Sequence, residues 1–435
     1  MNTTKEPLTK SCPLNSEHQH RPLLPFLLLT NTFPPRGGSS VQRAAKFAKY
    51  AHRNGESPIV ITASFSGGLT DPSLVNDLPS ELEVHRVTES TLSSASILTR
   101  LLRRTGLLRL PDEHAAYGRA ATRKACEIAK YKTIGAVFIS YGVPSTLIAG
   151  IRIAGRLKCP VILDIRDFKR KNAYSSHKIR PSRPLRDFMI KCIEAWAFAK
   201  VDYFTVVSQN YKEILSDHYA IPEDRVAVIY NGYDPEDFNH ALNSTNTQHL
   251  NPVLRYVGFV THQPSLENLL VALRAVNELR HRQSKPMVRL EIIGGNNHEA
   301  LEQIIARHNA TEWCTARRYV PHAEAVDLMK SADGLVLLQH AEHGCLTGKF
   351  FEYVGAARPI LLLDNENHEL RSLVKQNDLG VVAPHDDIEH IVASIDTILN
   401  MTVCQAGKKL DNFRRDIQTD QFLGVIQKAM KERAA

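Results

Sequence analysis

Short apolar runs alternate with longer amphipathic stretches from residue 22 onward. Residues 23–30, 58–62 and 134–140 are rich in large or β-branched apolar side chains, as buried strands are. Between such runs, residues 41–54 and 144–157 place apolar or small residues at helical spacing. This alternation predicts βαβ units and a parallel sheet that is covered by helices on both faces.

A second series of the same kind follows a turn-rich segment at residues 231–235 and a polar stretch at residues 240–251. We expect its strands at residues 253–257, 289–293, 318–320, 334–338, 359–363 and 380–382. The predicted fold class is therefore α/β, with two doubly wound Rossmann-like domains. The predicted borders are a disordered tail over residues 1–20, a first domain over 21–235, a second domain over 236–404, and a C-terminal helix within 405–435 that packs back on the first domain.

The composition is that of an ordinary globular protein. The chain has 435 residues, of which 43% are hydrophobic and 23% are charged, with 22 Gly and 22 Pro. These values exclude a collagen-like, low-complexity or wholly disordered chain. The length is also too great for one compact core, which supports the division into domains.

The two parts of the chain carry opposite net charge. Residues 1–200 contain 31 Lys and Arg against 15 Asp and Glu, whereas residues 201–435 contain 23 against 31. The first part is therefore basic by +16 and the second acidic by −8, which gives the formal net charge of +8. We expect the first part to face something anionic, such as a membrane, a nucleic acid or a phosphorylated substrate.

Two basic segments of the first part suit an anionic bilayer surface. Residues 152–191 contain 12 Lys and Arg against three Asp and Glu, and four arginines lie among leucines within residues 100–110. Basic residues mixed with leucines can lie on a membrane, although a solvated helix face explains them equally well. Aromatic residues are sparse among them and no binding motif is recognised, so no nucleic acid partner is expected.

The cysteines and apolar runs favour a cytoplasmic protein, either free or peripheral on the inner face of the membrane. The seven cysteines form no Cys-x-x-Cys pair and no zinc-like spacing, which fits a reducing compartment. The apolar run near the start is shorter than the roughly 20 residues that a membrane helix requires. No Asp-x-Asp sequence occurs, so nothing in the sequence indicates a divalent metal.

A glycine pair in the first domain could approach an anion. Gly37 and Gly38 lie between the first predicted strand and its helix, where the backbone can come close to a ligand and the helix N-terminus favours negative charge. The loop does not match the dinucleotide fingerprint Gly-x-Gly-x-x-Gly. A tight turn between strand and helix is an equally good interpretation.

The most informative segment lies in the second domain. Thr347 is a plausible N-cap of a helix that begins at about Gly348, after a buried strand. Lys349 and Glu352 then share one helix face within the first two turns. Helix N–H groups and the lysine suit a diphosphate, and the carboxylate suits sugar hydroxyls. A surface Lys–Glu pair on an amphipathic helix is the alternative.

The segment Gly348-Lys349-Phe350-Phe351-Glu352-Tyr353, followed by Arg358-Pro359-Ile360, resembles the donor-site signature of retaining GT-B glycosyltransferases. The resemblance is to the large family that includes bacterial polysaccharide, O-antigen and lipid-linked-glycan transferases. It spans residues 22–400 approximately and implies two Rossmann-like domains that face each other across a cleft. Five further segments are similar to that family in order and spacing: residues 34–38, 164–167, 206–209, 228–234 with Phe238, and 256–258.

The resemblance implies a role for each matching residue. The nucleotide-diphosphate sugar, as co-substrate, would lie in the second domain and the glycan or lipid-linked acceptor would approach from the first. Lys349 would stabilise the leaving diphosphate, Glu352 would bind the ribose, and Asp167 on a first-domain loop is the other catalytic candidate. No metal cofactor is implied. The remaining donor-binding residues would be Gly37, Gly38, Gly294, Tyr319, Val320, Thr347 and Gly348.

The sequence departs from the family pattern at two places. The family's Glu-x7-Glu motif ends at Glu352, but its first position is Gly344, and Glu342 is the nearest carboxylate. The loop after Gly258, where the family often has an Arg and a Lys, offers no cation except His262. Lys349 would therefore carry more of the charge that neutralises a diphosphate.

These observations predict a retaining glycosyltransferase of cell-envelope or exopolysaccharide biosynthesis. Three alternatives stay open: another GT-B enzyme such as a nucleotide-sugar epimerase, a non-catalytic GT-B partner protein, and, on the basic first half, a nucleic-acid binder.

Overall fold

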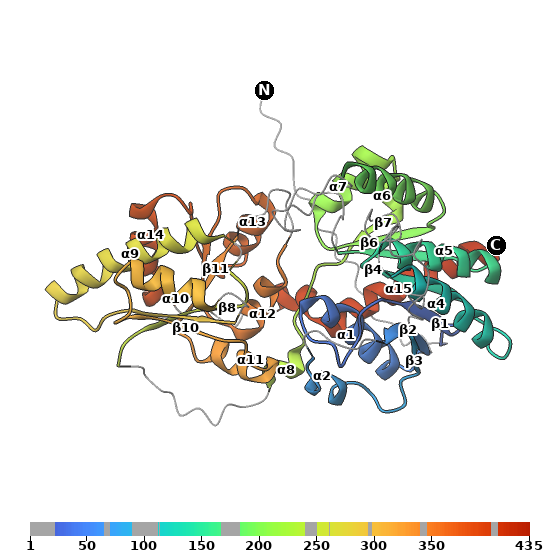
Figure 1. Ribbon diagram of the computed structural model, residues 1–435, viewed down its shortest axis with the longest axis horizontal. Helices are drawn as coiled ribbons and strands as arrows, with labels where there is room; N and C mark the ends of the chain where they lie inside the picture. Colours follow the sequence, from blue (N-terminus) through green and yellow to red (C-terminus); the bar gives the residue numbers. More distant parts are fainter. Residues whose placement is uncertain are drawn as a thin grey trace, which may run out of the picture.

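The structure is a computed structural model that describes residues 22–64, 70–88, 112, 114–166, 183–239, 250–260, 262–294, 298–339, 346–401 and 408–435. It contains two parallel sheets, one in each lobe of the molecule (Figure 1). The predicted α/β fold with two doubly wound Rossmann-like sheets is thereby confirmed.

The first sheet has the order β3-β2-β1-β4-β5-β6-β7, and all its strand pairs are parallel. Its strands are β1 (Phe26–Leu29), β2 (Pro58–Ser64), β3 (Val84–Thr88), β4 (Ala136–Tyr141), β5 (Val161–Ile165), β6 (Tyr203–Val206) and β7 (Val226–Val228). The central strand β1 is the apolar run Phe-Leu-Leu-Leu and is buried on both faces. In the register, Leu28 lies beside Val60 of β2 and Phe138 of β4.

Helices cover both faces of this sheet. The helices and turns of the first lobe are α1 (Ser39–Arg53), α2 (Ser73–Asn76), α4 (Ala115–Ile128), α5 (Pro144–Leu157), α6 (Arg183–Phe198), α7 (Gln209–Tyr219) and η3 (Glu223–Arg225). Because side chains alternate along β1, Leu27 and Leu29 pack with α4, α5 and α6, whereas Phe26 and Leu28 pack with α1 on the opposite face.

The second sheet has the order β10-β9-β8-β11-β12-β13 and is also parallel. Its strands are β8 (Val253–Val257), β9 (Arg289–Ile293), β10 (Cys314–Arg317), β11 (Gly334–Leu338), β12 (Ile360–Leu363) and β13 (Gly380–Ala383). Its helices are α9 (Gln263–Arg282), α10 (His298–Arg307), α11 (His322–Lys330), α12 (Gly348–Ala356), α13 (His368–Gln376) and α14 (Ile388–Asn400). The strand predicted at residues 318–320 is wrong: β10 ends at Arg317, and residues 318–320 belong to the loop that follows it.

Two segments connect the lobes. After β7 the chain forms the short helix α8 (Pro235–Asn239), and after the second sheet it forms η4 (Lys408–Phe413) and α15 (Arg415–Ala434). Helix α15, red in Figure 1, returns to the first lobe and packs against α1 and the strands β4, β5 and β6. Its Phe422 ring lies 4.9 Å from Phe47 of α1, so residues from α15 complete the first-lobe core.

The carboxyl-end loops of the two sheets meet. Tyr319, which follows β10, donates its hydroxyl to Asp71, which lies between β2 and β3, at 3.4 Å. Glu369 at the start of α13 accepts from the backbone N–H of Gln209, at the start of α7, at 2.9 Å. In doubly wound sheets, ligands bind beyond the carboxyl ends of the strands. The facing edges are therefore where a ligand shared by the two lobes is expected.

Candidate functional site

Lys349 lies at the start of α12 and reaches back to the end of β8. Its ammonium donates to the hydroxyl of Tyr256 at 2.5 Å and to the carbonyl of Phe259 at 2.8 Å. It also sits 4.5 Å from the centre of the Tyr256 ring, within the range of a cation–π contact. Burial lowers the pKa of Lys349 to about 8, and the neighbouring Glu352 charge only partly opposes this.

Two glycines make room for this lysine at the sheet edge. Gly258 follows β8 with a φ of 126°, and a Cβ atom there would lie 2.3 Å from Cε of Lys349. Gly294 follows β9 with a φ of 96°, and its Cβ would lie 3.5 Å from the Cα of Gly258. Both positions therefore require glycine, for the backbone angle and, at Gly258, for the space that Lys349 occupies. Gly294, which was predicted to border the nucleotide, lies directly beside Gly258.

Glu352 is one turn further along α12 and is half-buried. Within the part of the chain that the structure describes, its carboxylate makes no hydrogen bond or ion pair. Its charge nevertheless acts on groups from three elements. Burial lowers the pKa of Lys349 and of Arg415 on α15, and the Glu352 charge opposes this lowering. At His322 on α11, burial would lower the pKa, but the hydrogen bond to Asp237 and the Glu352 charge together raise it. The Lys349–Glu352 pair is thus not a simple surface ion pair, because the lysine bonds elsewhere.

At the start of α12, the N–H of Phe350 donates to the carbonyl of Thr347 at 3.2 Å, and the N–H groups of Gly348 and Lys349 make no hydrogen bond to a described residue. Thr347 is the N-cap residue as predicted, but its side chain makes no capping hydrogen bond, and the helix begins at Gly348. The helix is held instead by Tyr353, whose hydroxyl accepts from the backbone N–H of Val257 at 2.9 Å. An uncapped helix start beside a lysine is an arrangement that favours an anion.

The other predicted donor-binding residues lie on the loops around this point. Gly38 precedes α1 with a φ of 99°, and Gly37 beside it is buried. Val320 is half-buried against the core beneath α11 and α12. Tyr319 is 45% exposed and contacts Asp71 of the opposite lobe, so its side chain contributes to the contact between the lobes.

Some predicted residues fall outside the described residues. Asp167, Glu342 and Gly344 belong to this group, so their positions are not placed here. Tyr141, which ends β4 at the same edge of the sheet, is described and is buried. Its hydroxyl donates to Glu194 at 2.9 Å, and burial raises its pKa well above its ordinary value, which makes it a poor base.

His262 does not replace the missing cations of the loop after Gly258. Its Nδ1 accepts from the backbone N–H of Ser265 at 3.3 Å, which makes His262 the N-cap of α9. A ring nitrogen that accepts a hydrogen bond carries no proton, so the cap favours the neutral ring. Lys349 is therefore the positive side chain that contacts this loop within the described residues.

A buried network of charges joins α1 to the segment after β7, and sequence reasoning missed it. The Lys49 ammonium bonds to Asp77 at 2.6 Å, Asp234 at 2.8 Å and Glu236 at 2.8 Å. These three carboxylates lie within 4.8 Å of one another, and Lys49 supplies the positive charge between them. The lysines keep the pKa of Asp234 below its usual range despite its burial.

The network extends to the second lobe. Lys46 bonds to Asp234 and lies 3.1 Å from Asp237 on α8, and Asp237 in turn pairs with His322 of α11 at 3.0 Å. The hydrogen bond and the charge of Asp237, with Glu352 nearby, raise the pKa of His322 although burial opposes this. One feature of the sequence pointed to this network: Lys46 and Lys49 are three residues apart, which places them on the same side of α1. The apolar side chains of α1 are buried as well.

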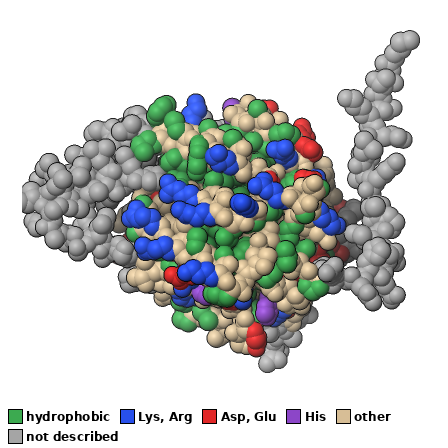
Figure 2. Space-filling model, turned by 90° about the vertical axis from the view of Figure 1, so that its right-hand side faces the viewer, with side chains coloured by type: hydrophobic (Ala, Val, Ile, Leu, Met, Phe, Trp, Pro, Cys, Tyr) green, Lys and Arg blue, Asp and Glu red, His purple; other side chains and the backbone are tan. Residues whose placement is uncertain are grey.

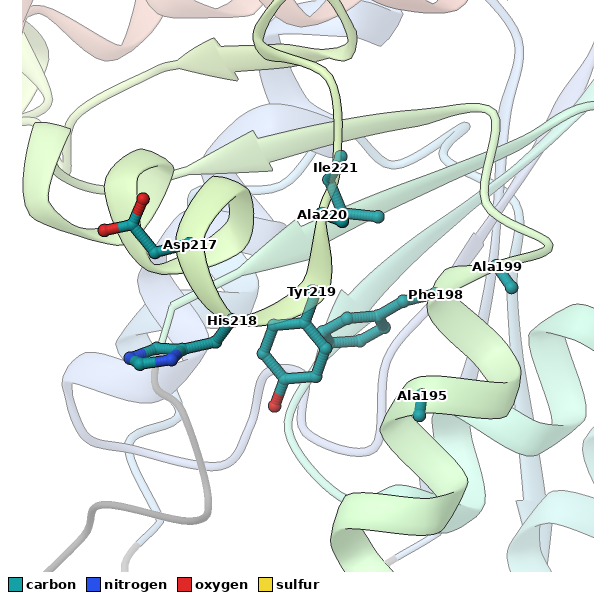
Figure 3. Close-up of a pocket in the computed structure, with 8 residues that line it drawn as sticks. All are labelled: Ala195, Phe198, Ala199, Asp217, His218, Tyr219, Ala220 and Ile221. Carbon is teal, nitrogen blue, oxygen red and sulfur yellow. The ribbon is translucent and has the colours of Figure 1, made fainter.

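A separate pocket of about 370 Å³ lies between the ends of α6 and α7 (Figure 3). Figure 3 shows the rings of Phe198 and Tyr219 side by side along it, with Asp217 and His218 at one end. Its residues precede β6 and β7, at the amino ends of the strands. The pocket is therefore at the sheet edge opposite to Lys349 and Gly38.

Comparison with known proteins relates each lobe to a family. The family described as Glycosyltransferase Family 4 matches residues 40–237, and the family described as Glycosyl transferases group 1 matches residues 251–401. An uncharacterized glycosyltransferase of Methanocaldococcus jannaschii, MJ1607, is 25% identical over 204 residues, which are 45% of this chain and 50% of that protein. The match thus spans half the length of that relative.

The whole fold matches solved structures. HepE from Anabaena, determined with UDP-glucose, superposes with a TM-score of 0.63 at 14% identity, covering 93% of this chain and 100% of that one. Sucrose-phosphate synthase from Thermosynechococcus elongatus superposes with a TM-score of 0.64 at 12% identity, covering 94% and 100%. At 12–14% identity, this similarity shows that the chains share a fold, and it shows nothing about ligands or activity.

Proposed function

Because this chain belongs to the GT-B glycosyltransferases, we propose that it is a retaining glycosyltransferase that uses a nucleotide-diphosphate sugar. The sugar would pass to a glycan or lipid-linked acceptor in cell-envelope or exopolysaccharide biosynthesis. The observation that carries the proposal is the Lys349 ammonium, held against the loop after β8 beside the uncapped start of α12.

The donor would bind along α12 with its diphosphate at the helix start. The Lys349 ammonium and the first N–H groups of the helix offer positive charge there. The half-buried Glu352 carboxylate, which no hydrogen bond holds within the described residues, could accept hydrogen bonds from ribose hydroxyls. Gly294, Tyr319 and Val320 would border the base. HepE was determined with UDP-glucose, so uridine diphosphate is the first nucleotide to test.

Transfer would rely on electrostatic stabilisation of the leaving diphosphate. Negative charge develops on that group as the bond to the sugar breaks, and preorganised N–H dipoles and an ammonium stabilise it without being rearranged. Lys349 is the proposed catalytic cation. Asp167 remains the predicted first-domain group near the reacting sugar, and the proposal requires no metal.

A membrane surface is the proposed meeting place with a lipid-linked acceptor. Helix α6 exposes Phe188 and Trp196, with 64% and 44% of their surface accessible, beside the exposed Lys191 and Lys200. Figure 2 shows Lys and Arg side chains gathered on the outer face of the first lobe, with few Asp or Glu. Aromatic and basic residues together favour the interface of an anionic bilayer. Among the described helices, none has the length and apolar character of a membrane span.

Thermal-shift measurements with UDP, GDP, ADP, CMP and dTDP would test the donor site. At least one nucleoside diphosphate should raise the melting temperature of the wild type and fail to do so in Lys349→Met. Lys428→Met is the matched control, because that lysine also lies over a tyrosine ring, 4.8 Å from Tyr203, but on α15. Equal shifts in the two variants would remove Lys349 from the donor site.

A further inference from the structure

The first turn of α15 carries an arginine without a partner. Arg415 is half-buried, and within the described part of the chain its guanidinium makes no hydrogen bond or ion pair. The neighbouring Arg414, by contrast, pairs with Asp411 at 3.4 Å and with Asp416 at 2.7 Å. A guanidinium offers five N–H donors, so partial burial without an acceptor lowers the stability of the fold. Proteins keep such unfavourable groups where they bind a ligand.

The side of α15 that carries Arg415 faces helix α1. Arg43 of α1 lies with its guanidinium 4.8 Å from the centre of the Phe422 ring. Phe422 follows Arg415 by seven residues, which places the two on the same side of α15. Arg43 is fully partnered, since it donates to the carboxylate of Asp164 and to two backbone carbonyls. No acceptor of α1 is therefore reserved for Arg415.

The start of α15 is also packed against α12. The ring of Phe413, two residues before Arg415, lies 6.1 Å from the ring of Phe350 and 5.3 Å from that of Phe351. Glu352 directly follows these two residues on α12. Arg415 is thus held between α1 of the first lobe and α12 of the second, and Figure 1 shows the start of α15, in red, at this place.

The charges around Arg415 agree with this position. Burial and, to a smaller extent, the charge of Arg43 lower the pKa of Arg415 to about 10, although the Glu352 carboxylate opposes this. The guanidinium is therefore still charged at neutral pH. It senses a cation of the first lobe and a carboxylate of the second, and it forms an ion pair with neither lobe.

Arg415 lies near the starts of both helices. Arg43 and Glu352 each belong to the first two turns of their helix, and each helix begins at the carboxyl edge of its sheet. These edges face each other, as the contacts of Tyr319 and of Glu369 with the first lobe show. Lys349, Glu352 and Arg415 are all half-buried, so each keeps contact with solvent. A ligand between the edges would therefore lie close to the Arg415 guanidinium.

We propose that Arg415 binds the diphosphate of the donor as a second cation beside Lys349, an inference that rests on the proposed function. A planar guanidinium can donate two parallel N–H groups to two oxygens of one phosphate, which a single ammonium cannot do. The loop after Gly258 supplies no such group, because it contains no Lys or Arg and His262 caps α9. Helix α15 would thus provide, from a distant part of the chain, the positive charge that this loop lacks.

The test measures how far nucleotide binding depends on the phosphates. The probes are the nucleoside diphosphate that gives the largest melting-temperature shift among UDP, GDP, ADP and dTDP, and the nucleoside with the same base. In the full chain, Arg415→Gln should weaken diphosphate binding about tenfold by calorimetry, because the phosphates lose a charge-assisted hydrogen bond. Nucleoside binding, followed by saturation-transfer NMR, should stay unchanged. Arg415→Lys keeps the charge without the fork and should give an intermediate affinity.

Arg414→Gln is the matched control. Arg414 belongs to the same turn, but its guanidinium is already held by Asp411 and Asp416, so this variant should bind the diphosphate as the wild type does. The melting temperature of the free proteins is a second readout. Arg415→Gln removes an unpaired cation near Arg43, so its melting temperature should stay level or rise, whereas Arg414→Gln loses two ion pairs and should not gain stability.

Three results would overturn the inference. If Lys349→Met loses diphosphate binding and Arg415→Gln keeps it, the proposed donor site stands and Arg415 does not belong to it. If Arg415→Gln weakens nucleoside and diphosphate binding equally and lowers the melting temperature, Arg415 supports the fold instead of the ligand. A wild type that binds none of the four diphosphates would contradict the proposed donor site itself, and the role of Arg415 would fall with it.

Discussion

At the scale of single residues, Lys349 and Glu352 belong to different local structures although they are three residues apart. The lysine is fixed by Tyr256 and Phe259, whereas the glutamate is held by no hydrogen bond within the described residues. The two side chains should therefore respond differently to substitution. Substitution of Lys349 removes a charge that neighbouring groups hold in place. Substitution of Glu352 removes a charge that no hydrogen bond holds within the described residues.

Nucleotide binding should weaken at alkaline pH. The pKa of Lys349 is lowered to about 8, so the side chain loses its proton as the pH rises through that value, whereas the phosphates of UDP stay ionised. Calorimetry should show the affinity for UDP falling about tenfold between pH 7 and pH 9. Lys349→Arg keeps its charge over this range and should give a flat profile. The same decline in both proteins would place the titrating group elsewhere.

Glu352→Gln should reduce UDP affinity about tenfold with little effect on the fold. The substitution keeps the shape of the side chain and removes a carboxylate that makes no hydrogen bond or ion pair with the described residues, so the melting temperature should change by no more than about 2 °C. Lys349→Ala and Glu352→Ala should each abolish most transfer while the fold stays intact. Near-wild-type turnover in both purified variants would remove the assignment of the donor site.

At the scale of elements, α12 and the end of β8 form one unit. The side chain of Lys349 and the hydroxyl of Tyr353 both reach back across the loop after β8, and Gly258 leaves the space for the lysine. A side chain at position 258 would therefore displace the ammonium group of Lys349 without changing its charge.

Gly258→Ala should both destabilise the protein and weaken UDP binding. The new Cβ would collide with Lys349 and the backbone has a φ of 126°, so a loss of about 1–3 kcal/mol in the free energy of unfolding is expected. Gly155→Ala is the control: that glycine lies within α5 with open space around its Cα, and alanine there should stabilise by about 0.5–1 kcal/mol. Urea titration and calorimetry would measure the two effects. A Gly258→Ala protein of normal stability and affinity would contradict the packing described.

The sequence predicted those elements whose signal is local. Strand β1 is a continuous apolar run, and α12 follows a capping residue, so neither needed knowledge of distant contacts. The strand was predicted at residues 318–320 instead of 314–317 because both stretches mix polar and apolar residues. The sequence alone does not show which of the two pairs with β9. The buried lysines of α1 could not be predicted, since Asp234, the fully buried carboxylate that they share, follows Lys46 by 188 residues and Lys49 by 185. The family resemblance of the α12 segment, by contrast, is confirmed by matches to both lobes.

At the scale of the whole molecule, the charge network and the loop contacts fix how the lobes meet. Asp234 lies at its centre, fully buried and bonded to Lys46, Lys49 and the hydroxyl of Tyr50. Through Asp237 the network also reaches His322, on which the charge of Glu352 in the proposed donor site acts. A change in the network should therefore affect both stability and nucleotide binding.

Asp234→Asn should be strongly destabilising. It leaves two buried ammonium groups without their shared carboxylate, a change that typically costs about 3–5 kcal/mol. Asp77→Asn, whose side chain is 24% exposed, removes a more accessible partner of the same lysines and should cost less. Because the pKa of Asp234 is lowered, its contribution is present above the usual aspartate pKa and is lost as the pH falls. Urea unfolding at pH 7 and pH 3 would show a larger gap between wild type and Asp234→Asn at pH 7, because pH 3 lies below the usual aspartate pKa; equal gaps would contradict the network.

Helix α15 also sets an order of events during synthesis. Its Phe422 completes the core beneath α1, but the ribosome makes it only after all six strands of the second sheet. Domains usually fold from the N-terminal one onward as the chain emerges. Here the second lobe can complete its own core first, while the first lobe waits with Phe47 and Phe138 uncovered on its α1 face. A nascent chain halted before α15 should therefore be protected from proteases in its later half and bound by chaperones in its earlier half.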